Sequence, residues 1–199
     1  MKAMRLFGIL GVAGFAATAS AQSVMNPSYE SGPASTGWTR VNLGSQAIEG
    51  WTVDQGNIDH IGTMWRAAEG NRSIELNGDA PGRIHQVLQT NPGSQYIVEF
   101  ALSGNWGGHW NKKVRLTAGD ESELFFFDSS NNRSYNMNWE DRQFVFTADA
   151  ATTTLRFASN NYGKHGGAVD NIRVSEIIVP APAAGLALLG LAGMGRRRR

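Results

Sequence analysis

Two tryptophans lie in a loop-like run near the middle of the chain, Ser103-Gly-Asn-Trp-Gly-Gly-His-Trp-Asn111. Trp106 and Trp110 stand there among glycines and polar residues, outside any alternating strand pattern. Aromatic rings on exposed loops suit sugar binding, because a pyranose face stacks on a ring while Asn and His side chains hydrogen-bond its hydroxyls. The alternative is that these tryptophans cap the hydrophobic core. If the loops converge at one edge of the fold, the expected ligand-binding residues are Trp65, Trp106, His109, Trp110 and Tyr162.

The sequence contains few residues in arrangements that are typical of catalytic sites. It contains no G-x-S-x-G, H-E-x-x-H or P-loop motif, and its 4 histidines are scattered without metal-ligand spacing. Glycosidases use a pair of carboxylates that face each other across a cleft, whereas neighbours along one strand point to opposite faces. The carboxylate clusters are therefore interpreted as solvated turns, and we expect neither catalytic residues nor an enzyme. These clusters are Asp120/Glu121/Glu123 and Glu140/Asp141.

The N-terminus has the pattern of a secretory signal peptide. Lys2 and Arg5 precede the apolar run 6–17, and Ala19-Ser20-Ala21 has the small-x-small form of a cleavage site. We therefore expect residues 1–21 to be a signal peptide that is removed before Gln22. A buried N-terminal helix is the alternative.

Charge and cysteine content narrow the function classes. Residues 22–179 carry 12 basic and 17 acidic side chains, a net charge of −5, so the basic isoelectric point comes from the two ends of the chain. An acidic domain without a stripe of Lys and Arg predicts no nucleic-acid partner. The chain has no cysteine, which excludes a disulfide scaffold and a thiol enzyme.

Alternating apolar residues and glycine turns predict an all-β fold. Tyr96, Val98, Phe100 and Leu102 share one strand face, and similar runs recur toward residue 179. The central run 59–89 contains the dipeptide Asn-Gly at 77–78 after an alternating segment, which predicts a strand that reverses into its partner. About ten such strands separated by turn signals predict a single antiparallel jelly-roll β-sandwich over residues 22–179.

The central run also carries a resemblance to a known family. Its wording D-x-I-G-x-x-W-x-A-x-x-G-x-R-S-I-x-L-N-G-x-x-P-G, from Asp59 to Gly82, resembles the bacterial choice-of-anchor C family. This resemblance implies a galactose-binding-like jelly roll of the kind found in cell-wall and extracellular proteins. The run N-P-S-Y-E-S-G at 26–32 is similar to the opening strand of extracellular carbohydrate-binding jelly rolls.

Jelly rolls of this kind often hold one structural calcium ion between their first and last strands. The resemblance places Glu30 and Asp170 at comparable positions, and calcium prefers such hard oxygen ligands. The alternative is that Asp170 and Asn171 hydrogen-bond backbone groups at the start of a strand. No cofactor is required under either interpretation.

The C-terminus resembles the PEP-CTERM sorting signal of Gram-negative bacteria. Residues 180–199 contain a Pro-x-Pro motif, an apolar stretch and four terminal arginines, and Ala181 replaces the usual Glu. An apolar tract before a basic end orients a segment in the membrane, so we expect an apolar anchor helix here. The resemblance implies an exosortase-type sorting protease as a partner; an unstructured tail is the alternative.

These patterns together predict a non-catalytic binding module that is exported to the cell envelope, the outer surface or the extracellular space. Its expected partner is an extracellular polysaccharide or a cell-wall glycan. A structural or adhesive matrix protein without a small ligand is the second hypothesis, and a glycan-active hydrolase is the third.

Overall fold

The computed structural model describes residues 18–22 and 24–178, and the ordered elements within them are strands. No helix occurs in this described part, so none there is long and apolar enough to cross a membrane. The twelve strands are β1 (Thr18–Gln22), β2 (Trp38–Asn42), β3 (Thr52–Gln55), β4 (Asn57–Ile61), β5 (Ser73–Glu75), β6 (Arg83–Gln89), β7 (Gln95–Gly104), β8 (Asn111–Ala118), β9 (Glu121–Asp128), β10 (Glu140–Thr147), β11 (Thr152–Ser159) and β12 (Gly167–Ile178).

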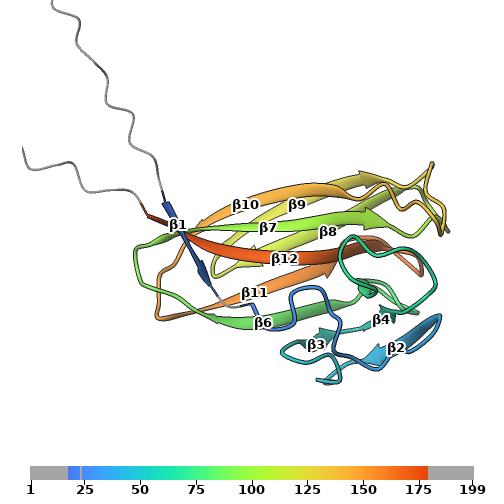
Figure 1. Ribbon diagram of the computed structural model, residues 1–199, viewed down its shortest axis with the longest axis horizontal. Coiled ribbons are helices and arrows are strands. Elements are labelled where there is room, and N and C mark those ends of the chain that lie inside the picture. The colour runs from blue at the N-terminus through green and yellow to red at the C-terminus, as the bar shows by residue number, and fades with distance from the viewer. Residues whose placement is uncertain (1–17, 23, 179–199) are drawn as a thin grey trace, which may run out of the picture.

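The strands form two antiparallel sheets that pack face to face (Figure 1). Sheet A has the order β10-β7-β12-β5-β4-β2, and β1 pairs with the C-terminal part of β12. Sheet B has the order β3-β6-β11-β8-β9. The predicted all-β antiparallel sandwich is thereby confirmed.

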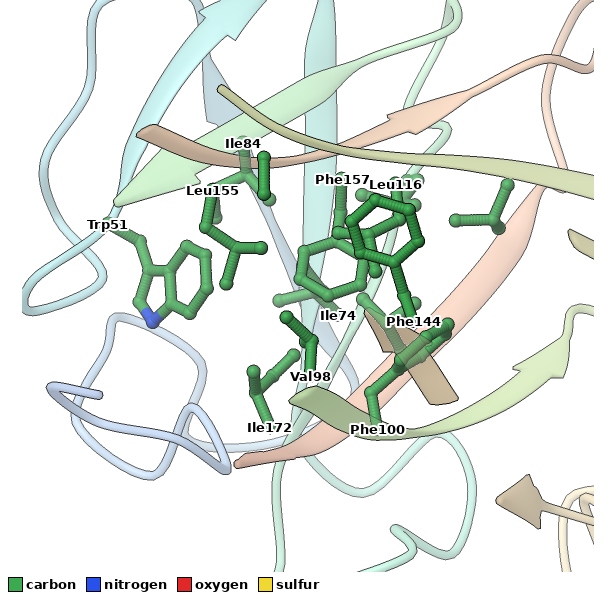
Figure 2. Close-up of a cluster of buried hydrophobic side chains, with 14 of the residues drawn as sticks. Trp51, Ile74, Ile84, Val98, Phe100, Leu116, Phe144, Leu155, Phe157 and Ile172 are labelled. Atoms are coloured by element: carbon green, nitrogen blue, oxygen red, sulfur yellow. The ribbon is translucent and has the colours of Figure 1, made fainter. Parts of the chain in front are cut away.

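The core lies between the sheets and follows the alternation of apolar residues. Phe100 of β7 packs edge-on against Phe125 of β9 and Phe157 of β11, with ring centroids 5.1 and 5.2 Å apart. Trp51 closes one side of this cluster, as Figure 2 shows. Every described member of the core lies between residues 24 and 174, so the segment 22–178 contains all of the described core and is the segment chosen for expression.

The predicted hairpin at Asn77 and Gly78 is wrong. β5 belongs to sheet A and β6 to sheet B, so the segment between them crosses from one sheet to the other. Gly78 does not adopt a positive φ angle. A Cβ at this position would lie 2.3 Å from Asn57 Oδ1 and 2.4 Å from Arg40 Nε. The glycine is therefore required for close packing at the crossover, a need that a turn pattern in the sequence does not reveal.

The expected sorting segments lie largely outside the described residues. β1 covers the expected cleavage position after Ala21, and it pairs in register with Val174 to Ile178 of β12. The C-terminal anchor at 180–199 lies entirely outside them. The signal peptide and the anchor helix stay predictions.

Candidate functional site

Two loops lie side by side at one end of the sandwich and form what we call the two-loop edge. Residues 105–110 join β7 of sheet A to β8 of sheet B, and residues 160–166 join β11 of sheet B to β12 of sheet A. Both loops therefore connect one sheet to the other at the same end of the sandwich. This end is opposite β1, at the right in Figure 1. The loops touch directly, because the backbone N–H of Asn105 donates to the carbonyl of Gly166 over 3.0 Å.

Buried charges hold the two loops together from below. The ammonium group of Lys112 donates to the carbonyls of Gly107 (2.7 Å) and His165 (2.8 Å), one in each loop. The carboxylate of Glu75 accepts from Asn105 Nδ2 (2.8 Å) and from the backbone N–H of Gly166 (2.7 Å), again one in each loop. The two-loop edge is thus preorganised by four hydrogen bonds from two oppositely charged side chains.

Burial shifts the titration of both charged groups. Glu75 is 2% exposed, and desolvation raises its pKa from 4.5 to about 7, although its two N–H donors and Lys112 act in the opposite direction. Desolvation also lowers the pKa of the fully buried Lys112 from 10.5 to about 8.

One side of the two-loop edge carries exposed aromatic rings around a hollow that we call the edge groove. It has a volume of about 350 Å³ and is lined by His109, Asn111, Lys113, Asn160, Asn161 and Tyr162. The ring of Trp110 stacks on His109 with centroids 5.0 Å apart, and it is 59% exposed. Tyr162 is 98% exposed. These rings contribute little burial to the fold, so they are available to a ligand.

The polar floor of the edge groove is fixed by one asparagine. Asn161 Oδ1 accepts from the backbone N–H of Lys113 over 2.7 Å, and its Nδ2 donates to the carbonyl of Asn111 over 2.9 Å. This pair of bonds ties the 160–166 loop to the start of β8. Aromatic rings beside a rigid polar floor are the arrangement that sugar recognition requires.

A second hollow, the sheet-face pocket, lies on the outer face of sheet A. Its volume is about 170 Å³, and its lining includes Trp38, Asp59, Glu75, Asn105 and His165. Asp59 of β4 and Glu75 of β5 are direct cross-strand neighbours and therefore lie on the same face. Asp59 forms an ion pair with Arg40, and both Glu75 oxygens accept hydrogen bonds. The pair is thus engaged in structural contacts.

The structure brings together three of the five predicted ligand-binding residues. His109 and Tyr162 line the edge groove, and Trp110 stacks on His109 beside it. Trp65 is instead a core residue, 4% exposed, whose indole N–H donates to Ser73 Oγ over 2.9 Å. Trp106 packs edge-on against Trp65, with centroids 5.8 Å apart. The geometry of Trp65 therefore supports a structural role in the core.

Trp65 also borders a further hollow, which has a volume of about 670 Å³. This hollow lies along the loop 62–72 and includes Glu30, Arg66, Arg72 and Tyr135 in its lining. The loop is held by the two carboxylates for which calcium was expected. Glu30 Oε1 accepts from the backbone N–H groups of 71 and 72, and Asp170 Oδ2 accepts from those of 68 and 69.

The calcium prediction does not fit this geometry well. Glu30 and Asp170 receive N–H donors, and calcium requires six to eight oxygen ligands. Residues 18–22 and 24–178 contain no group of three His, Asp or Glu side chains that could hold a metal ion. Burial raises the pKa of Asp170 to about 7. The backbone-binding alternative is favoured, and calcium binding stays a prediction.

A thermal-unfolding measurement decides between these alternatives. Because the loop is already held by hydrogen bonds, we expect residues 22–178 to unfold at the same temperature in EDTA and in excess calcium. A rise of several degrees in calcium would show that the loop opens to admit the ion. Loss of that rise in Glu30→Gln would assign the ion to this position.

Comparison with known proteins assigns the domain to a protein family. The sequence model of a protein family described as a protein of unknown function, DUF642, matches residues 22–175. The chain belongs to this family. Halomucin from Haloquadratum walsbyi is 31% identical over 186 residues, which cover 88% of this chain and 2% of halomucin. The chain thus spans a small fraction of that relative's length.

Solved structures similar to this DUF642 domain include several carbohydrate-binding modules. TmCBM61 in complex with beta-1,4-galactotriose has a TM-score of 0.52 at 14% identity, over 78% of this chain and 98% of that chain. A family 35 module from an environmental isolate has a TM-score of 0.48 at 16% identity, over 78% and 98% of the two chains. At these sequence identities the likeness concerns the fold alone. The TM-score of the family 35 module is below 0.5, so no argument is based on it.

These comparisons confirm the expected fold and assign the domain to a family that the sequence analysis did not name. The domain is a two-sheet sandwich that resembles the jelly rolls of carbohydrate-binding modules, within the DUF642 family. The choice-of-anchor C and PEP-CTERM resemblances stay predictions.

Proposed function

We propose that this domain is a non-catalytic glycan-binding module and that the edge groove is its contact surface. The observation that carries the proposal is the convergence of Trp110, His109 and Tyr162 beside the asparagines of a fixed polar floor. Exposing a tryptophan and a tyrosine costs hydration free energy without stabilising the fold, and sugar stacking gives both rings a role. The fold likeness to a galactotriose-bound module supports the same function.

The sheet-face pocket does not favour the hydrolase hypothesis. A general acid must approach the glycosidic oxygen of its substrate, and a nucleophile must approach the anomeric carbon. Asp59 is held by Arg40, and both oxygens of the buried Glu75 face N–H donors of the two loops. We therefore propose binding without catalysis.

The proposed setting is the cell surface or the extracellular polysaccharide matrix. It is supported by the signal-peptide pattern before Gln22 and by the apolar, basic C-terminus. Removal or anchoring of the tail by an exosortase-type protease belongs to this proposal. An adhesive matrix protein without a small ligand is the competing function.

A polysaccharide-binding screen on residues 22–178 tests the proposal. We expect saturable binding to at least one extracellular polysaccharide by affinity electrophoresis, with free oligosaccharide of the same composition competing for it. Self-association or capture of other proteins, together with a flat response to every glycan, would overturn the proposal in favour of the adhesive function.

A further inference from the structure

The outer face of sheet B carries a concentration of positive charge that the edge groove does not explain. Inward side chains such as Ile84, Leu116 and Phe157 fix the orientation of the strands, so their neighbours in sequence point away from the core. The basic residues at these outward positions are Arg83 on β6, Lys113 and Arg115 on β8, and Arg156 on β11. The outward positions of sheet B contain two carboxylates, Asp54 on β3 and Asp128 at the end of the edge strand β9.

This charge is segregated from the rest of the domain. Residues 22–178 carry 12 basic and 17 acidic side chains, so the remainder of the domain has eight basic against 15 acidic ones. A polyanion would therefore be attracted to this face and repelled elsewhere. The basic row has only four residues, whereas a nucleic acid needs a longer basic stripe along its backbone.

Asp54 holds two of the arginines in place without using their outer nitrogens. Its Oδ1 lies 2.7 Å from Arg83 Nε, and its Oδ2 lies 3.6 Å from Arg156 Nε. Within the described part of the chain, the terminal guanidinium nitrogens of these two arginines donate no hydrogen bond. Arginine presents such nitrogens as a fork to carboxylate and sulfate oxygens, and prior positioning lowers the entropic cost of binding.

The basic face is continuous with the edge groove. Lys113 lines the groove, and Arg115 is the next outward residue along β8. Strand pairing places Arg115 opposite Ala158, and Ala158 opposite Arg83, so the two arginines flank a small side chain on the central strand. Adjacent strands are about 4.8 Å apart, which puts cations at intervals along a path that leaves the groove (β8, β11 and β6 in Figure 1).

We propose that the ligand is an acidic polysaccharide, whose sugar rings stack in the edge groove and whose carboxylate or sulfate groups bind Lys113, Arg115, Arg156 and Arg83. This inference rests on the proposed function and adds the chemical class of the glycan. A glycan fits better than another polyanion because the row of cations begins at exposed aromatic rings.

The test uses two forms of one polymer that differ in charge alone. Polygalacturonate is ionised at each sugar, and its fully methyl-esterified form is neutral. We expect residues 22–178 to bind polygalacturonate at least tenfold more tightly than the esterified form at low salt, with the preference falling as salt rises. Dextran sulfate compared with dextran then separates sulfate from carboxylate recognition.

The decisive variant is Arg83→Gln/Arg115→Gln/Arg156→Gln. We expect it to lose the preference for the charged polymer while keeping binding to the neutral one. Arg133→Gln/Arg142→Gln/Arg173→Gln removes the same number of arginines elsewhere on the domain and is expected to keep the preference. Melting temperatures of both variants control for folding.

Three results would overturn the inference, and they differ from a failure of the proposed function. Equal binding to both forms of the polymer would leave a glycan-binding module without charge selectivity. Loss of the preference in the control variant would make net charge, rather than this face, responsible. Equally tight binding of single-stranded DNA would indicate a general polyanion site. Absence of binding to every glycan would remove the proposed function itself.

Discussion

Trp110→Ala/Tyr162→Ala is expected to bind glycan roughly tenfold to a hundredfold more weakly than the unaltered domain. A stacked aromatic contact is worth about 0.5–1.5 kcal/mol beyond its buried area, and about 1.4 kcal/mol corresponds to a factor of ten in affinity. Because the two rings are 59% and 98% exposed, their loss should leave the melting temperature nearly unchanged. Isothermal titration with the best polysaccharide of the screen measures the affinity.

Trp38→Ala is the matched control for this variant. Trp38 is also an exposed tryptophan, 48% accessible, but it lines the sheet-face pocket and lies under the guanidinium of Arg40, 5.2 Å from the ring centroid. Unchanged affinity in Trp38→Ala supports the edge groove. If Trp38→Ala removes binding and the double variant does not, the glycan occupies the sheet-face pocket instead.

The strands and the core follow from sequence because alternation reports burial directly. Tyr96, Val98, Phe100 and Leu102 were expected on one face, and all four are buried between the sheets. The pattern does not report which sheet a short strand joins. β5 has three residues and pairs with β4 and β12, so the partner of the run before Asn77 is decided by packing at long range.

The aromatic part of the site was predictable for a related reason. His109, Trp110 and Tyr162 lie outside the alternating apolar pattern of the strands. Their exposure could therefore be inferred from the glycines and polar residues around them. Trp65 has a similar setting in the sequence, yet it is covered by other parts of the chain. It packs in a second cluster with the nearby Ile61 and with Met137, which is far from it in sequence.

The buried charges below the two-loop edge were missed, although one of them leaves a trace in the sequence. Lys112 has the same parity as Val114 and Leu116, which are inward residues, so the pattern places a lysine on the core side of β8. Glu75 has no such trace, because an outward position next to Ile74 normally faces solvent. It is buried because the two loops close over this part of sheet A.

Glu75→Gln is expected to change how stability depends on pH. Folded Glu75 has a pKa of about 7, whereas the unfolded chain releases this proton near 4.5. Between these values the folded state binds more protons, so the contribution of Glu75 is fully present below pH 4.5 and is lost as pH rises toward 7. One unit of pKa corresponds to about 1.4 kcal/mol, and we expect a loss of about 1–3 kcal/mol across this window.

The measurement is the difference in unfolding free energy between the unaltered domain and Glu75→Gln, from urea titrations at pH 4.5 and 7.5. Taking the difference cancels the pH dependence of groups that both proteins share. Asp170, whose pKa is raised, makes stability fall with pH as Glu75 does, and the buried His60, whose pKa is lowered by desolvation, makes stability rise with pH.

Glu49→Gln, at an exposed position, is the control and should give a difference that is constant within a few tenths of a kcal/mol. A constant difference for Glu75→Gln would mean that the pKa of Glu75 is the same in the folded and the unfolded state. The N–H donors of Asn105 and Gly166, together with the nearby Lys112, would then offset the cost of its burial.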